Sequence, residues 1–235
     1  MSGVSHMALL AGLAAGSTGI TFVGSDSSSE GSNRDTINLT LPVGHQADDF
    51  AIVTSAVANT SNNMDVITAL GYTLLYNEES TNGQVMEHWL WYKKLTSGSE
   101  VNPSVSMSGF NREHHATLHV FRGVDTTTPF DAVVEYAFDD LENTPNPTNP
   151  AITTVTPNAA IFLIHNPSHN GISVAGTPSG YVLSENEVGI NHREYFTAYL
   201  LDAGAAGVKS PPIWGHTTTD SSPDGAAITL ALRPA

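Results

Sequence analysis

The stretch HHATLHVF (residues 114–121) decides whether this chain is a β protein or a carrier of a metal site. Apolar residues alternate with polar ones, so that Leu118 and Val120 lie on one side and His115 and His119 on the other. A period of two is typical of a β-strand with one face buried. We therefore predict a half-buried strand whose histidines face outward or toward an interface.

Metal binding by these histidines is not favoured by strand geometry. His115 and His119 would lie roughly 13 Å apart at about 3.3 Å per residue, whereas zinc ligands sit about 2 Å from the metal. We predict that neither they nor His114 binds a structural metal. His165 and His169 flank Asn-Pro-Ser in an expected loop, where two imidazoles could meet. Two ligands are half a site, so a polar loop is the simpler interpretation and we predict no metal site.

Composition excludes several functional classes. The 235 residues carry 40% hydrophobic and 13% charged residues, and the net charge is −15. Such a charge repels phosphate groups, so we expect no nucleic-acid partner. The chain has no cysteine, which excludes disulfides, thiolate metal sites and a cysteine nucleophile.

Short strands fill most of the chain. A Pro-rich acidic segment at 139–150, DDLENTPNPTNP, is expected to be a loop or linker. Turn signals separate the predicted strands, which is typical of an all-β sandwich or jelly roll. The expected strands are 20–23, 36–41, 49–57, 72–77, 85–94, 104–109, 114–121, 151–155, 159–165, 180–185, 193–202 and 226–234.

Two halves of the chain repeat each other weakly. LGYTLL at 70–75 matches SGYVLS at 179–184, and EHWLWYKKLTSG at 87–98 matches REYFTAYLLDAG at 193–204. Ordered landmarks of this kind predict an internal repeat. We therefore predict a jelly-roll-like antiparallel β-sandwich over 20–235, built from pseudo-repeated halves at about 36–123 and 150–234.

A short apolar arm precedes this sandwich. Residues 1–19 form the arm, and its longest apolar run is too short for the roughly 20 residues that span a bilayer. We expect no membrane partner. Met7, Leu9, Leu10 and Leu13 could form an apolar stripe, and we predict that they make an assembly contact with another chain.

No catalytic constellation stands out, and we expect neither an enzyme nor a cofactor. GISVAG (171–176) resembles a nucleophile elbow, but Ala175 replaces the second glycine and no helix can follow. A glycosidase needs two carboxylates about 5 to 9.5 Å apart, and nothing selects such a pair among 23 acids.

Two tryptophans leave an alternative open. Trp89 and Trp91 share one face of a predicted strand. If exposed, they would suggest a receptor platform or an interface anchor. If buried, they would be sandwich core, which we favour because aromatic residues are mostly buried against a sheet partner.

The phrase FRGVDTTTPFDA (121–132) carries a resemblance, together with LTLPVGHQADDFAIV (39–53) and GYTLL (71–75). In their order along the chain, 39–53, 71–75 and 121–132, they resemble a set of uncharacterised β-sandwich structural proteins of tailed phages and prophages, over roughly 20–233. The resemblance implies a virion part without a catalytic site and brings no functional residues. Arg122 and Asp125 match the signature, and we interpret them as a strand-end turn.

Two functions follow as expectations. The first is a capsid decoration or cement protein that stabilises the phage shell by docking on it. The alternative is a tail-appendage or fibre module that binds a host-surface carbohydrate. We expect the partners to be other virion proteins, either the major capsid protein or tail proteins, and we expect a homo-oligomer. The location would be the virion, assembled in the cytoplasm of the bacterial host.

Overall fold

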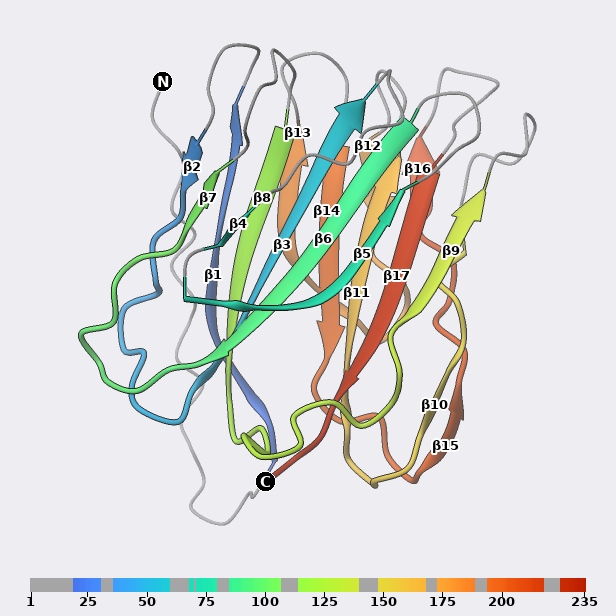
Figure 1. Cartoon of the computed structure of the whole chain (residues 1–235). Coiled ribbons are helices and arrows are strands. Elements are labelled where there is room, and N and C mark those ends of the chain that lie inside the picture. The colour runs from blue at the N-terminus through green and yellow to red at the C-terminus, as the bar shows by residue number, and fades with distance from the viewer. Residues whose placement is uncertain are drawn as a thin grey trace.

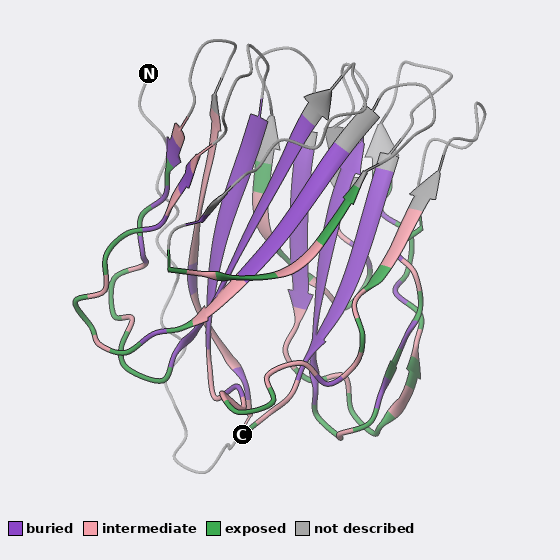
Figure 2. Cartoon of the chain, viewed as in Figure 1, coloured by how far each residue is buried: buried purple, intermediate pink, exposed green. Residues whose placement is uncertain are grey.

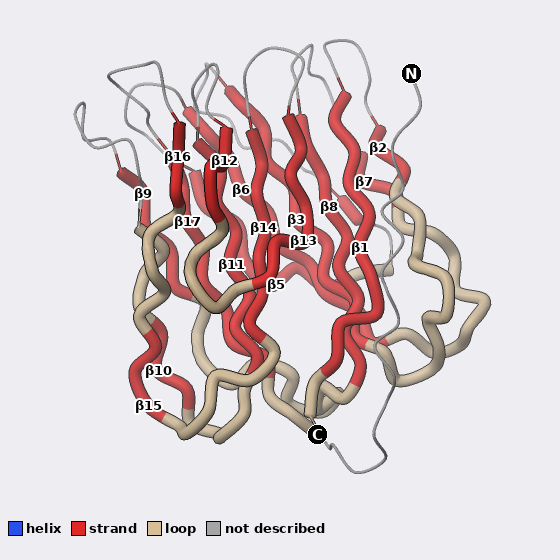
Figure 3. Tube along the Cα trace, turned by 180° about the vertical axis from the view of Figure 1, so that it is seen from behind, coloured by secondary structure: helices blue, strands red, loops and turns tan. Residues whose placement is uncertain are grey.

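The computed structural model describes residues 19–30, 36–59, 68–69, 71–79, 85–106, 114–139, 148–167, 173–188, 194–217 and 225–235. Every regular element in these ranges is a strand, and all strand pairs are antiparallel (Figure 3). None of these residues lies in a helix that could cross a membrane. The predicted all-β antiparallel sandwich is therefore confirmed.

The first large sheet uses strands from the first half of the chain, in the order β1-β8-β3-β6-β5 (Figure 1). Its strands are β1 (Thr21–Glu30), β8 (His114–Arg122), β3 (Phe50–Asn59), β6 (Val85–Lys94) and β5 (Thr73–Glu79). The central strand β3 pairs with β6 and β8, so β1 and β5 are the edges.

The second large sheet uses strands from the rest of the chain, in the order β13-β14-β11-β17-β9. Its strands are β13 (Val182–Val188), β14 (Glu194–Leu200), β11 (Ala160–Pro167), β17 (Gly225–Leu232) and β9 (Glu135–Asp139). Numbered by their order in the chain, the strands of the first sheet read from β1 and those of the second sheet read from β9 both follow the order 1-5-2-4-3. Because each sheet is contiguous in sequence, this topology does not establish the chain crossing between sheets that defines a jelly roll.

Three small sheets complete the fold. They contain β2 (Thr36–Asn38), β7 (Ser104–Ser106) and β4 (Thr68–Ala69); β10 (Ile152–Thr154) and β15 (Gly207–Lys209); and β12 (Ser173–Gly176) and β16 (Gly215–Thr217). The first covers the outer face of the first large sheet, where Ile37 and Val105 pack against Trp89 and Trp91. On the second large sheet Ile152 and Trp214 occupy the equivalent outer position.

The two large sheets share one inner core. Phe50, Ile52 and Phe121 from the first sheet pack with Phe162 and Leu230 from the second. The central strands are buried on both faces (Figure 2). The half-buried strand expected at 114–121 is therefore wrong, because β8 has an outer small sheet on one side and the second sheet on the other. His115 and His119 instead lie at the interface between the two large sheets, which agrees with the predicted interfacial histidine face.

The landmark turns of the two halves have the same geometry. Gly71 and Gly180 have φ of 80° and 88°, a region that favours glycine. The next residue closes the turn in each case: the amide of Tyr72 donates to the carbonyl of Ala69, and that of Tyr181 to the carbonyl of Pro178, both at 3.0 Å. These landmarks lie immediately before β5 and β13.

The strand registers also match. Tyr92 on β6 is opposite Thr73, and Tyr199 on β14 is opposite Val182. A bulge follows within two residues in both β5 and β13. Each residue of one strand therefore has a counterpart at the same place in the register of the matching strand, and such a pair is called register-equivalent. A common origin of the two halves stays a prediction.

The signature turn after β8 joins the two halves. Arg122 donates to both carboxylate oxygens of Asp49, at 2.8 and 2.9 Å, and this fork holds the start of β3. The carbonyl of Gly123 accepts from Ala235, and the amide of Asp125 donates to Arg233, both at 2.9 Å. The predicted strand-end turn is thus a structural junction with the C-terminal residues.

A polar chain crosses the inner core. Tyr195 donates to Thr54 at 2.6 Å, and Thr54 bonds to Thr117 at 2.7 Å. His119 Nε2 lies 2.8 Å from the hydroxyl of Thr197 on the facing sheet. Burial lowers the pKa of His119 to about 3, so this imidazole is neutral. His119 thus forms a hydrogen bond between the two large sheets.

Some element boundaries differ from expectation. β1 continues through a serine-rich stretch to Glu30, and β9 (Glu135–Asp139) was not expected at all. The matching sheets thus begin at Thr21 and Glu135, earlier than the predicted half boundaries. Part of the predicted 139–150 loop is also buried: Asn149 donates to two strand carbonyls and accepts from Trp214 Nε1.

Candidate functional site

The sandwich has two lateral edges with the same backbone plan. On one edge β1 packs against β13. On the other edge β5 and β9 hold the register-equivalent places, but the described residues of these two strands make no comparable contact. One edge is therefore closed and the other is open.

Polar side chains close the first edge. Ser27 donates to the carboxylate of Glu185 at 2.8 Å, and Ser25 donates to the carbonyl of Ser184 at 3.4 Å. The hydroxyl of Ser184 also lies 3.1 Å from His119 Nε2, which connects this edge to the buried polar chain. Hydrogen bonds from one sheet to the other thus hold β1 and β13 together.

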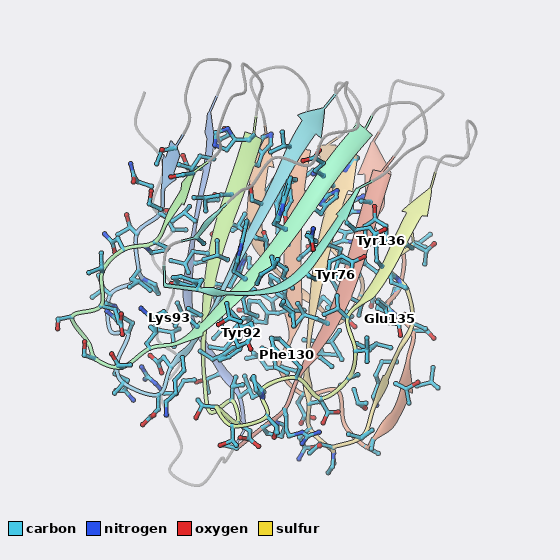
Figure 4. The ribbon with its side chains drawn as sticks, in the orientation of Figure 1. Tyr76, Tyr92, Lys93, Phe130, Glu135 and Tyr136 are labelled. Atoms are coloured by element: carbon cyan, nitrogen blue, oxygen red, sulfur yellow. The ribbon has the colours of Figure 1, made fainter. Side chains whose placement is uncertain are left out.

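Apolar and aromatic side chains stand at the register-equivalent positions of the open edge. Leu75 and Tyr76 replace the Ser184–Glu185 pair, while Val134 and Tyr136 replace Ser25 and Ser27. The Tyr76 and Tyr136 rings are in contact, with centroids 5.8 Å apart and ring planes tilted by 39° (Figure 4). Where the closed edge has hydrogen bonds, the open edge has a ring contact.

A groove of about 550 Å³ results, and we call it the edge groove. It is lined by Leu75, Tyr76, Phe130, Ala132, Val133 and Val134. The bulge in β5 leaves Leu75 without a partner on β6, so it and Tyr76 both lean toward the inner core.

Phe130 is a lining residue of the edge groove that packs against the inner core. Its ring packs edge-on against that of Tyr92, with centroids 5.1 Å apart (Figure 4). It packs in the same way against Phe50, with centroids 5.7 Å apart. Its backbone forms a bridge with Leu232 on β17. Val133, in contrast, is 82% exposed at the rim. The lining of the groove therefore combines an aromatic ring packed on the inner core with an apolar side chain exposed to solvent.

Few polar groups of the described residues lie in or beside the edge groove. The Tyr76 hydroxyl donates to Glu78 at 3.4 Å, and burial, together with the Glu78 carboxylate, raises its pKa. Burial raises the pKa of Tyr136 as well, and its hydroxyl has no hydrogen-bond partner among the described residues. Behind it lies His88, with ring centroids 6.2 Å apart. Among the residues that the structure describes, no charged side chain lines the groove.

A second hollow, of about 270 Å³, lies beside the signature turn, between Asp48 and Asp125. Arg122, the cationic side chain among its described lining residues, already binds Asp49 in a fork. Asp125 is likewise engaged, because it accepts from the amides of Thr127 and Thr128. These groups hold the turn and leave little capacity for a ligand.

The residues singled out in the sequence lie elsewhere. Trp89 and Trp91 are only 4% and 3% exposed and belong to the outer core of the first sheet. The core interpretation fits this burial, and a receptor platform has no exposed ring to use. Met7, Leu9, Leu10 and Leu13 lie outside the described residues.

The histidines are also part of the fold. His114, His115 and His119 are buried on β8. His165 lies in β11 rather than in the expected loop, and stacks on Trp214 at 5.5 Å; His169 lies outside the described residues. Among the residues that the structure describes, no group of three His, Cys, Asp or Glu side chains could hold a metal ion.

Sequence reasoning missed the edge groove. The available signal was PFDAVVEYAF (129–138), whose Val134 and Tyr136 alternate with exposed residues like an edge strand. What it could not reveal is that this segment faces β5, because that depends on how two separate sheets stack.

The fold is an antiparallel β-sandwich of two large sheets, with one closed edge and one open edge that carries the edge groove. Comparisons of this chain with protein-family models, curated proteins and solved structures found no match.

Proposed function

We propose that the chain is a structural protein of a tailed-phage virion, a capsid decoration protein that works by docking rather than by catalysis. The observation that carries the proposal is that the residues of the FRGVD sequence (121–125) have structural roles in the fold. Gly123 and Asp125 form backbone hydrogen bonds with the C-terminal residues Ala235 and Arg233 and so join the two halves. Arg122 binds Asp49 and so ties the end of β8 to the start of β3. Because these signature residues stabilise the fold, they support the resemblance to the phage proteins as a resemblance of architecture.

Charge supports an outer position on a particle. The net charge of −15 disfavours contact with packaged DNA, since phosphate would be repelled. A docking protein also needs apolar surface that is free of charge. The edge groove is such a surface on the described part of the chain.

The carbohydrate alternative has weaker support. A sugar site combines a ring face with several polar groups that fix the hydroxyls. In the described part of its lining, the edge groove offers the Tyr76 ring and one side-chain hydroxyl, that of Tyr76. An apolar protein segment fits this lining better than a saccharide does.

Labelling of intact particles tests the proposal. Antibodies against the purified chain would be applied to particles from a phage or prophage that encodes it, and the labels located by electron microscopy. We expect many labels per shell, and we expect particles that lack the protein to release DNA at a lower temperature. Label confined to the tail would favour the appendage function, and particles without any label would overturn the proposal.

A further inference from the structure

The edge groove raises the question of what covers it. The register-equivalent edge is filled by contact between β1 and β13, with Ser27 bonded to Glu185. On the open edge Val133 and Leu74 are left exposed, although the chain carries a strongly acidic surface overall. An apolar groove without charge is unfavourable in water and is stabilised when an apolar segment covers it.

We propose that the edge groove receives the apolar segment Met7–Leu13 from a second copy of this chain. The proposal assigns a receptor to the apolar arm, which the proposed function leaves open. It stands apart from the phage assignment, because it concerns contacts between copies of this chain alone.

Composition matches the segment to the groove. Residues 7–13 read MALLAGL and carry no charge, and six uncharged residues line the groove. The volume of about 550 Å³ suits a few Leu-sized side chains and is too small for a folded domain. The small residues between the leucines permit close backbone approach to the free edge of β5.

Chain length permits the contact. Residues 1–18 precede Gly19, which lies against the signature turn at Gly123. Six residues connect Leu13 to Ile20 and could span at most about 20 Å when extended. The proposal therefore requires the edge groove of the second copy to lie within about this distance of the signature turn.

Disulfide trapping tests the proposal directly, because the chain has no cysteine of its own. Full-length Val133→Cys protein carrying a size tag would be mixed with untagged Leu10→Cys or Leu13→Cys protein under mild oxidation. Val101→Cys is the matched control, since Val101 and Val133 are both 82% exposed. We expect the mixed disulfide with Val133→Cys to form on the order of tenfold faster than with Val101→Cys, because docking raises the local concentration.

A charge in the groove gives an independent readout. We expect Val133→Asp to shift the wild-type oligomer toward monomer in light scattering, because docking would bury an unpaired carboxylate. Val101→Asp should leave the oligomer intact. Both sites are exposed, so both variants should fold, which far-ultraviolet circular dichroism verifies.

Several outcomes would overturn the proposal. Equal trapping at Val133 and Val101 would mean random collision. A double variant, with Val133→Cys and Leu10→Cys in one chain, could also be oxidised. If the disulfide forms only within this chain and not between chains, the groove is occupied by the protein's own arm. A monomeric wild-type protein that binds a glycan in a Tyr76-dependent way would make the occupant a saccharide. In each case particle labelling could still succeed, so the two proposals fail separately.

Discussion

Replacing His88 by leucine tests the chemistry of the inner core. His88 is buried on β6, and neither ring nitrogen has a hydrogen-bond partner among the described residues. It faces Tyr136 on β9, and its cross-strand neighbour on β5 is Glu78. Burial lowers its pKa from 6.5 to about 4, so the folded protein holds it neutral.

The direction of the pH effect follows from linkage. The unfolded chain binds a proton near pH 6.5 and the folded chain near pH 4, so acid favours unfolding. The stability that the neutral imidazole contributes is complete above about pH 6.5 and is lost as the pH falls toward 4. Between about pH 7.5 and pH 5 the loss amounts to about 2 kcal/mol for this one group.

As the pH falls over this interval, we therefore expect the free energy of unfolding of His88→Leu to decrease by about 2 kcal/mol less than that of the wild type. At neutral pH it should be at least as stable, since an unpartnered buried polar group is replaced by an apolar one of similar size. Urea unfolding at several pH values measures this, with fluorescence of the buried Trp89, Trp91 and Trp214 as the signal.

Thr54→Val is the control, because it removes a hydroxyl that bonds to Tyr195 and Thr117 without removing a titrating group. It should lower stability by about 1 to 3 kcal/mol at every pH and leave the pH dependence unchanged. Parallel pH curves for His88→Leu and wild type would show that His88 does not gain its proton on unfolding, and would refute the reasoning.

Three further predictions concern the signature turn and metals. Gly123→Ala should destabilise the fold by about 2 kcal/mol or more, against about 1 kcal/mol for Gly180→Ala. Both glycines have positive φ, but only at Gly123 would a Cβ lie 2.9 Å from a backbone oxygen, that of Gly19; similar losses in thermal unfolding would contradict this. Arg122→Lys should lose about 1 to 3 kcal/mol, because a lysine cannot form the fork that holds the buried Asp49, and an unchanged melting temperature would count against it. Finally, EDTA should leave the melting temperature unchanged, whereas a drop of several degrees that zinc or calcium reverses would restore a metal role for the histidines.

Strong periodicity made the central strands predictable. β3, β6, β8 and β11 all carry dense apolar or aromatic residues, and their expected ranges overlap the strands of the structure. The turns at Gly71 and Gly180 were visible because glycine marks a positive φ. Local chemistry therefore predicted the elements and the fold class.

The edge strands were harder to predict for a physical reason. β1 beyond Val23 reads GSDSSSE, which has few β-formers, and it is a strand because it pairs with β8 and bonds across to β13. The two faces of β8 were misjudged in the same way. Histidine looks solvent-facing in sequence, but a facing sheet that supplies Thr197 accommodates His119 inside. Such partners come from distant segments, which periodicity does not report.

The sequence-contiguous sheets have a consequence for synthesis on the ribosome. All strands of the first sheet are available once Arg122 has emerged, yet Phe162 and Leu230, which cover its inner face, come later. At about 5 to 20 residues per second, the remaining strands take roughly 5 to 20 seconds to follow. During that delay the nascent chain exposes half of a core, including Phe50 and Phe121. Neighbouring ribosomes on one messenger would present identical surfaces, so slow translation of the second half should favour pairing between unfinished chains.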